Sequence, residues 1–234
     1  MAKHPLIGVT VDHMEHPTET TESTYTVRAN YVTALRLSGA TAILLPCDIA
    51  AIQSYLRLCD GFLVTGSEPG EAGTTLRQDF ESELLQQTRD RHIPTFGICN
   101  GMQVMGQMLG GELHSTGQRG NGIDHKPRAY PTAPAHDLTM APEGFLGHLA
   151  GTSTTKVNSY HMQYLSDGGS FDVLARAPDG VVEAIAARNH PFFVGVQWHP
   201  EYLLSAFDHA LIERFVAACR NPTPSDACRD PGVR

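Results

Sequence analysis

A cysteine stands at the end of an apolar run, between two glycines. Residues 94–103 have the sequence PTFGICNGMQ, in which Gly97 and Gly101 flank Cys99. The pattern G-x-C-x-G after an apolar run predicts a strand that turns sharply into a helix, with the cysteine exposed at the bend. The N-terminus of that helix would stabilise a thiolate. The pattern therefore predicts a cysteine nucleophile, and a buried, inert cysteine before an ordinary helix is the alternative.

A histidine and a carboxylate follow a second apolar run. Residues 192–198 predict another strand, which delivers His199 and Glu201 at its end. A histidine can take a proton from a thiol and later protonate a leaving amine, and a carboxylate two residues away can fix the tautomer of the ring. Together with Cys99 they predict a Cys-His-Glu triad. Pro200 is also typical of a helix start, and both interpretations can hold at once.

Four blocks of the sequence resemble one family of enzymes. They are GICNGMQ at 97–103, VNSYH at 157–161, APDGVVEAI at 177–185 and NHPFFVGVQWHPE at 189–201. In their order and spacing the chain resembles the class I glutamine amidotransferase-like hydrolases, and within them the peptidase C26 enzymes related to gamma-glutamyl-gamma-aminobutyrate hydrolases. The resemblance extends from about Pro5 to Cys219.

Acyl transfer through a thiolate needs N–H donors where the oxyanion develops. One donor is expected to be the backbone N–H of Asn100, directly after the nucleophile. The resemblance implies that the other comes from the loop containing Gly66 and Ser67, where Thr65 replaces the proline usual in the family. A simple polar turn is the alternative for this loop.

The resemblance also implies which residues hold a γ-glutamyl group. They are Gln103, one turn after the elbow (the predicted strand-to-helix bend at Cys99), and the loop formed by Asn158, Ser159, Tyr160 and His161. From the residues alone, Gln103 could be a solvated helix residue, and His161 could be a surface histidine or a competing general base. We prefer His199 as the base because a carboxylate lies two residues away.

The predicted reaction is hydrolysis of a small γ-glutamyl amide to glutamate and a free amine through a thioester. Two alternatives remain: a glutaminase that supplies ammonia to a separate synthetase, and a binding module without activity. The intact candidate triad weighs against the last. The segment 68–75 is shorter than in the resembled hydrolases, so the leaving amine is left open.

Composition restricts the partners. The 234 residues suffice for one α/β domain, expected over 1–220, and we expect 221–234 to be a disordered tail. The net charge of −8 and the lack of a Lys/Arg run exclude an obvious nucleic-acid or membrane surface, which favours a small-molecule substrate. Without a signal sequence or a spanning segment, a cytoplasmic location is expected. A homodimer is left open.

Cysteine and histidine spacing indicates neither a disulfide framework nor a metal site. Five cysteines contain no C-x-x-C pair, and Cys47 and Cys59 lie in apolar contexts typical of a core. His13 and His16 are spaced like ligands, but they are expected in a polar loop without an obvious third ligand. No metal and no other cofactor is therefore expected.

Apolar runs alternate with helical periodicity in the first half, which predicts βαβ units. The expected fold is α/β, with three layers, a mostly parallel central sheet, helices on both faces and a flavodoxin-like core. Strands are expected at 5–11, 41–45, 61–64, 94–98, 156–159, 171–177, 181–187 and 192–196, and helices at 27–38, 48–58, 76–91, 100 onward and 203–218. The segment 114–134 is expected to be a long surface excursion that borders the site.

Overall fold

A nine-stranded sheet forms the centre of the structure, a computed structural model that describes residues 4–15, 22–68, 73–116 and 123–220. Its strands are β1 (Leu6–Thr10), β4 (Thr41–Leu45), β5 (Gly61–Val64), β6 (Thr95–Ile98), β8 (His136–Met140), β9 (Thr154–Val157), β11 (Phe171–Arg176), β12 (Val182–Ala187) and β13 (Phe193–Val196). The spatial order is β4-β1-β5-β6-β13-β12-β11-β8-β9. Sequence-distant β6 and β13 are therefore neighbours.

The sheet has a parallel and an antiparallel half. Strands β4, β1, β5, β6 and β13 are parallel, whereas β12, β11, β8 and β9 extend the sheet through antiparallel pairs. Parallel neighbours need long crossovers, which the helices of the first half supply, while antiparallel neighbours can be joined by short turns. The α/β class is confirmed.

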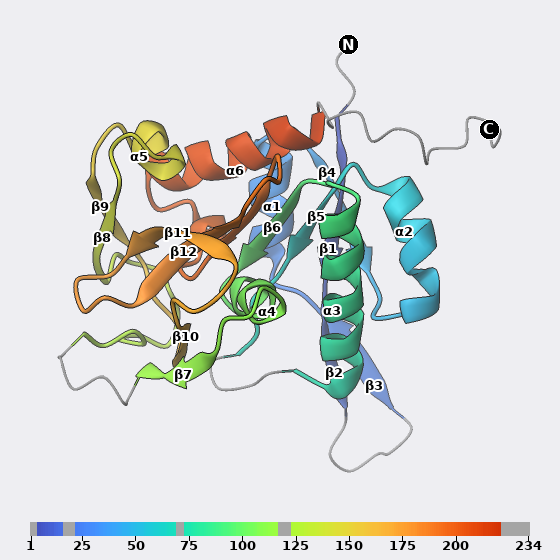
Figure 1. Cartoon of the computed structure of the whole chain (residues 1–234). Helices are drawn as coiled ribbons and strands as arrows, with labels where there is room; N and C mark the ends of the chain where they lie inside the picture. The colour runs from blue at the N-terminus through green and yellow to red at the C-terminus, as the bar shows by residue number, and fades with distance from the viewer. Residues whose placement is uncertain (1–3, 16–21, 69–72, 117–122, 221–234) are drawn as a thin grey trace.

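Helices cover both faces of the sheet, as expected (Figure 1). They are α1 (Ala29–Leu37), α2 (Ile52–Leu58), α3 (Thr75–Asp90), α4 (Asn100–Met108), α5 (Phe145–Ala150) and α6 (Ala206–Arg220). Alternate side chains of β5 separate the two layers. Leu63 belongs to a buried cluster that includes residues of α1, α5 and α6, whereas Phe62 belongs to a cluster with residues of α2 and α3, and Val64 to one with residues of α4. All four β5 residues are buried, which explains the continuous apolar run.

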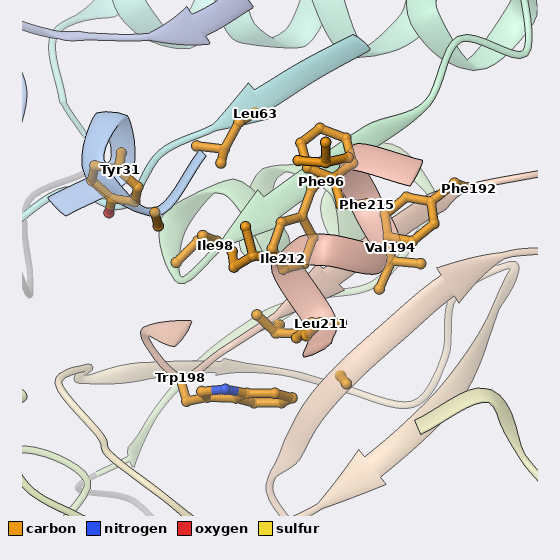
Figure 2. Packing of buried hydrophobic residues seen from close by; sticks show 14 of the residues in the cluster. Tyr31, Leu63, Phe96, Ile98, Phe192, Val194, Trp198, Leu211, Ile212 and Phe215 are labelled. Carbon is orange, nitrogen blue, oxygen red and sulfur yellow. The ribbon is translucent and has the colours of Figure 1, made fainter. Parts of the chain in front are cut away.

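An aromatic core supports the strand that leads to the candidate base. Phe96, Phe192 and Phe215 form mutual ring contacts with centroids 5.5–6.2 Å apart between the sheet and α6 (Figure 2). Trp198 is fully buried, and its Nε1–H donates to Asp208 Oδ1 at 3.2 Å. The residue before the candidate histidine is thereby anchored to α6.

The structure corrects several expected boundaries. The last helix begins at Ala206 rather than 203, because Pro200–Tyr202 form a separate 3-10 turn that Leu203 ends with φ of 53°. The strand expected at 156–159 is β9 at Thr154–Val157, and β8 and α5 were not expected.

Two small two-stranded sheets lie outside the main sheet. Each is an antiparallel pair: β2 (Asp12–Glu15) pairs with β3 (Ser23–Thr26), and β7 (Leu113–Ser115) pairs with the sequence-distant β10 (Gln163–Leu165). His13 therefore lies in a strand rather than in the expected loop, and His16 and the expected tail 221–234 lie outside the described residues. Among the residues that are described, no helix combines the length and apolar character needed to cross a membrane.

Candidate active site

The elbow around Cys99 has the predicted form. Strand β6 ends at Ile98, α4 begins at Asn100, and Cys99 between them has φ of 54° and ψ of −106°, an uncommon conformation for a residue with a side chain. A Cβ at Gly101 would lie 2.2 Å from the carbonyl oxygen of Val64, and one at Gly97 would lie 2.7 Å from Met105 Sδ. Both glycines are therefore required by close packing around the turn.

The thiol is more enclosed than expected, since Cys99 is only 4% exposed. Its Sγ lies 3.9 Å from the carbonyl oxygen of Tyr160, and Gln197 Nε2 donates to it at 3.5 Å. Gln197 is in turn held by Gln103, whose Nε2 donates to Gln197 Oε1 at 3.2 Å and to the carbonyl oxygen of Gln163 at 3.1 Å. Gln197 was not expected at the site from the sequence, although it lies two residues before His199.

His199 and Glu201 form a buried pair. The distance from His199 Nδ1 to Glu201 Oε1 is 2.8 Å, and both residues are at most 2% exposed. Because an ionised carboxylate only accepts, Nδ1 carries the proton and Nε2 is left for acid-base chemistry. Burial lowers the pKa of His199, but the charges and hydrogen bonds of Glu201 and Cys99 outweigh it and raise that pKa to about 10. The electrostatics therefore favour a positively charged His199 ring.

Asn158 holds the main chain of His199 from both sides. Its Oδ1 accepts from the His199 N–H at 2.8 Å, and its Nδ2 donates to the carbonyl oxygens of His199 and Pro131, each at 2.9 Å. The amide is thus fully engaged at the backbone of the candidate base. This geometry indicates a positioning role, whereas the resemblance implied contact with substrate.

The loop after β5 lies directly against the candidate triad. A Cβ added to Gly66 would lie 3.2 Å from His199 Cε1, 3.4 Å from Cys99 Cβ and 3.1 Å from Tyr31 Oη. The Gly66 N–H itself donates to Tyr31 Oη at 3.0 Å. Burial, with the charge of Glu201, raises the pKa of Tyr31 well above its usual value, so its hydroxyl is neutral. Of the expected donors, Gly66 is therefore already engaged.

A buried arginine, which no sequence pattern indicated, orients this loop. Arg77 is fully buried and donates to the carbonyl oxygens of Thr65 at 3.0 Å and Gly66 at 3.2 Å. In a trans peptide the C=O and N–H point in opposite directions. Fixing the Gly66 carbonyl toward Arg77 therefore directs the Ser67 N–H the other way. Asn100 is the first residue of α4, and the first N–H groups of a helix have no acceptor within the helix.

Comparisons with known proteins identify the family. The family profile of peptidase C26 matches residues 5–201. The chain belongs to the peptidase C26 family. It is 34% identical over 224 residues to the gamma-glutamyl-gamma-aminobutyrate hydrolase of Escherichia coli O157:H7, an alignment covering 85% of this chain and 88% of that protein. It is 30% identical over 236 residues to protein NtpR of Enterococcus hirae, covering 91% and 98%.

Other peptidase C26 relatives have less specific names. A Rickettsia prowazekii protein named as glutamine amidotransferase-like is 28% identical over 261 residues, covering 87% of this chain and 93% of the relative. Among solved structures, one described as a GMP synthase component from Thermoplasma acidophilum has a TM-score of 0.66 at 18% identity, covering 93% and 95% of the two chains. That similarity supports the fold, and the family supports a hydrolase.

The remaining residues of the 158–161 loop mostly face inward. Ser159 Oγ donates to the His125 carbonyl oxygen at 2.7 Å, and Tyr160 Oη donates to Glu68 Oε2 at 3.1 Å. His161 Nδ1 lies 2.9 Å from the carbonyl oxygen of Gln163, and burial lowers the pKa of His161 to about 4. His161 is therefore a neutral ring that lacks the carboxylate-to-Nδ1 contact seen at His199.

A pocket of about 310 Å³ adjoins the loop after β5. Its wall includes Ser67, Glu68 and Arg28, and the guanidinium of Arg28 pairs with the Glu68 carboxylate. The Arg28 side chain is 27% exposed and that of Glu68 is 51% exposed, so water screens the pair. The lining of the pocket thus contains both a positive and a negative side chain, a combination that suits a zwitterionic small molecule.

Proposed function

We propose that this protein hydrolyses a γ-glutamyl amide of a small amine to glutamate and the free amine. The observation that carries the proposal is the buried Nδ1–Oε1 contact of 2.8 Å between His199 and Glu201, coupled electrostatically to Cys99 at the elbow. The resemblance to gamma-glutamyl-gamma-aminobutyrate hydrolases supports the substrate class.

In the first half-reaction, Cys99 Sγ attacks the γ-carbonyl carbon and the carbonyl oxygen becomes an oxyanion. The N–H groups of Asn100 and Ser67 are the proposed donors to this oxygen. His199, protonated at Nε2, gives its proton to the amine nitrogen as the C–N bond breaks. The amine leaves, and a γ-glutamyl thioester to Cys99 remains.

In the second half-reaction, neutral His199 takes a proton from water as the water oxygen attacks the thioester carbonyl. The same N–H donors stabilise the second oxyanion. Collapse breaks the C–S bond, glutamate leaves, and the thiolate–imidazolium pair is restored. Glu201 holds the ring in one tautomer throughout and stabilises its positive charge.

We propose that the pocket beside Ser67 receives the amine portion of the substrate. A leaving amine with a terminal carboxylate, as in a γ-aminobutyrate derivative, would find a cation in Arg28. Charge-assisted bonds to a carboxylate contribute about 1.5–3 kcal/mol, or less where water screens them. Removing this cation should therefore raise KM for carboxylate-bearing amines and spare uncharged ones.

The decisive experiment compares hydrolysis of γ-glutamyl-γ-aminobutyrate, a γ-glutamyl alkylamide and glutamine by the isolated protein. We expect both amides to have a higher kcat/KM than glutamine, because contacts to the amine side add transition-state binding that ammonia cannot use. Arg28→Gln should weaken selectivity for the carboxylate-bearing amine. Arg36→Gln, an exposed change in the last turn of α1, the helix that Arg28 precedes as N-cap, is the matched control.

The name of a glutamine amidotransferase-like relative supports a second candidate function, that of a glutaminase that delivers ammonia to another protein. That function requires glutamine to be the best substrate and its hydrolysis to rise when a synthetase is added. Equal selectivity of the wild type and Arg28→Gln would refute the proposed role of the pocket while leaving the hydrolase proposal intact.

A further inference from the structure

Four buried side chains from separate parts of the sequence meet beside the candidate active site. This His₃Glu cluster consists of His125, His136 on β8, His161 and Glu183 on β12, and one ligand-type atom from each lies within 4.8 Å of the others. The four residues are between 0% and 6% exposed. A buried polar cluster needs a partner for each of its polar atoms.

The outward nitrogen of each ring already donates to oxygen. His136 Nδ1 lies 3.0 Å from the carbonyl oxygen of Asp137, His161 Nδ1 lies 2.9 Å from that of Gln163, and His125 Nε2 lies 3.0 Å from Asp179 Oδ2. Carbonyl and ionised carboxylate oxygens only accept, so the proton of each neutral ring is on that nitrogen. The second nitrogen of each ring is then a lone pair directed into the cluster.

Nothing in the described part of the chain satisfies the inner atoms. His125 Nδ1, His136 Nε2, His161 Nε2 and both oxygens of Glu183 have no hydrogen-bond partner among the described residues. Three nitrogen lone pairs and a carboxylate would repel one another around a common point. A cation at that point would replace this repulsion by attraction, because all four groups are electron-pair donors.

The spacing suits a metal ion better than a shared proton. Each inner ring nitrogen lies 3.5 Å from Glu183 Oε1. A hydrogen bond would shorten one such distance to about 2.8 Å. A tetrahedral Zn²⁺ with bonds of about 2.0–2.1 Å separates its ligand atoms by about 3.3 Å. The three nitrogen–oxygen distances are close to this value, and the four atoms all lie within 4.8 Å of one another. Small side-chain rotations would complete the tetrahedron.

We propose that the His₃Glu cluster binds one Zn²⁺ ion as a structural site. Imidazole and carboxylate ligands suit this borderline ion, and four protein ligands leave no open position for substrate. The outward hydrogen bonds to Asp179, to the Asp137 carbonyl and to the Gln163 carbonyl are the supporting contacts that zinc-bound histidines make.

The ion would fix the loop that carries active-site contacts. His161 directly follows Tyr160, whose carbonyl lies against Cys99 Sγ, and the loop begins with Asn158, which clamps His199. His161 N–H also donates to the His125 carbonyl oxygen at 3.0 Å. Binding the rings to Glu183 on β12 ties this loop to the central sheet.

The test measures metal directly, on untagged full-length protein. Elemental analysis should find about one zinc per chain, and the chelator-treated chain should take up Zn²⁺ or Co²⁺ with the same stoichiometry, Co²⁺ giving the visible bands of a tetrahedral complex. Zn²⁺ at about 100 times its Kd should raise Tm of the chelated chain by about 5–10 °C.

Variants locate the ion. Glu183→Gln and His136→Asn should each lose most of the bound zinc, whereas His148→Asn, an exposed change on α5, should retain it. Should a cluster variant fail to fold, the zinc content per chain of the wild type and its Tm with and without metal still test the proposal. Folded wild type that takes up no Zn²⁺ or Co²⁺ and has the same Tm with and without metal overturns the proposal, as does equal zinc loss from His148→Asn.

Discussion

Replacing Asn158 by alanine separates a positioning role from a substrate-binding role. The change removes three buried hydrogen bonds, from His199 N–H at 2.8 Å and to the carbonyls of His199 and Pro131 at 2.9 Å. At about 0.5–1.5 kcal/mol net for each bond, Asn158→Ala should lower the free energy of unfolding by about 2–4 kcal/mol. Because Asn158 is 3% exposed, solvent cannot replace the lost partners.

The kinetic effect should appear in kcat. The lost bonds hold the backbone of His199, and a displacement of about 1 Å in a catalytic group costs about 100-fold in rate. We expect Asn158→Ala to lower kcat by about that factor with little change in KM. Steady-state release of glutamate from a γ-glutamyl amide measures both constants, and urea denaturation measures the loss of stability.

Two further variants serve as a control and as a second test of the positioning role. Gln107→Ala removes an exposed amide from α4 and should change the free energy of unfolding by less than about 0.5 kcal/mol, with kcat unchanged. Asn158→Asp keeps the acceptor for His199 N–H but turns a carboxylate oxygen toward two carbonyls, so it should also lower kcat. A raised KM with unchanged kcat in Asn158→Ala would refute the positioning role and restore the direct substrate contact that the sequence implied.

Three other outcomes are expected. Iodoacetamide should label Cys99 faster than Cys47, because burial and the charge of a nearby carboxylate raise the pKa of Cys47 to about 12; equal labelling by mass spectrometry would contradict an activated thiol. Gly66→Ala places a methyl group 3.2 Å from the His199 ring and 3.4 Å from Cys99 Cβ, so kcat should fall at least about 10-fold while the far-ultraviolet circular dichroism stays unchanged; full activity would refute this packing. The pKa of His199 is raised from 6.5 to about 10, so the charged ring stabilises the fold fully below pH 6.5, and the free energy of unfolding should decline as the pH rises from 6.5 to about 10. Glu201→Gln should weaken this dependence in denaturant titrations, and an identical pH profile would show that another group causes it.

The sequence alone determined the parts of the site that depend on local chemistry. The elbow at Cys99 follows from the glycines on both sides, which are needed whatever the rest of the fold does. His199 and Glu201 are two residues apart, so the end of one buried strand brings both to the same place. The α/β class followed from the alternation of apolar runs and helical periodicity, which reflects burial of each strand on both faces.

Tertiary structure decided which polar side chains meet. Three contacts at the site join segments that are 11 to 98 positions apart in the sequence. They are the bond of Arg77 to the Gly66 carbonyl, the bond of Gln197 to Cys99 Sγ, and the bond between Asn158 and His199. Each polar residue is compatible with a solvent-exposed position when considered alone, so its pattern does not indicate a buried partner. The antiparallel strand β8 was missed for the same reason, because its pairing with β9 and β11 is non-local.

The His₃Glu cluster is the clearest case. His125, His136, His161 and Glu183 span 59 positions and show none of the short spacings by which metal ligands are recognised in a sequence. Ligand-like spacing occurs instead at His13 and His16, where His13 lies in β2 with its Nδ1 2.9 Å from Thr74 Oγ1. Ligand spacing is readable in a sequence only when one element supplies neighbouring ligands. Here four segments supply one residue each to the proposed site, so only the folding of the sheet and its loops brings these side chains together.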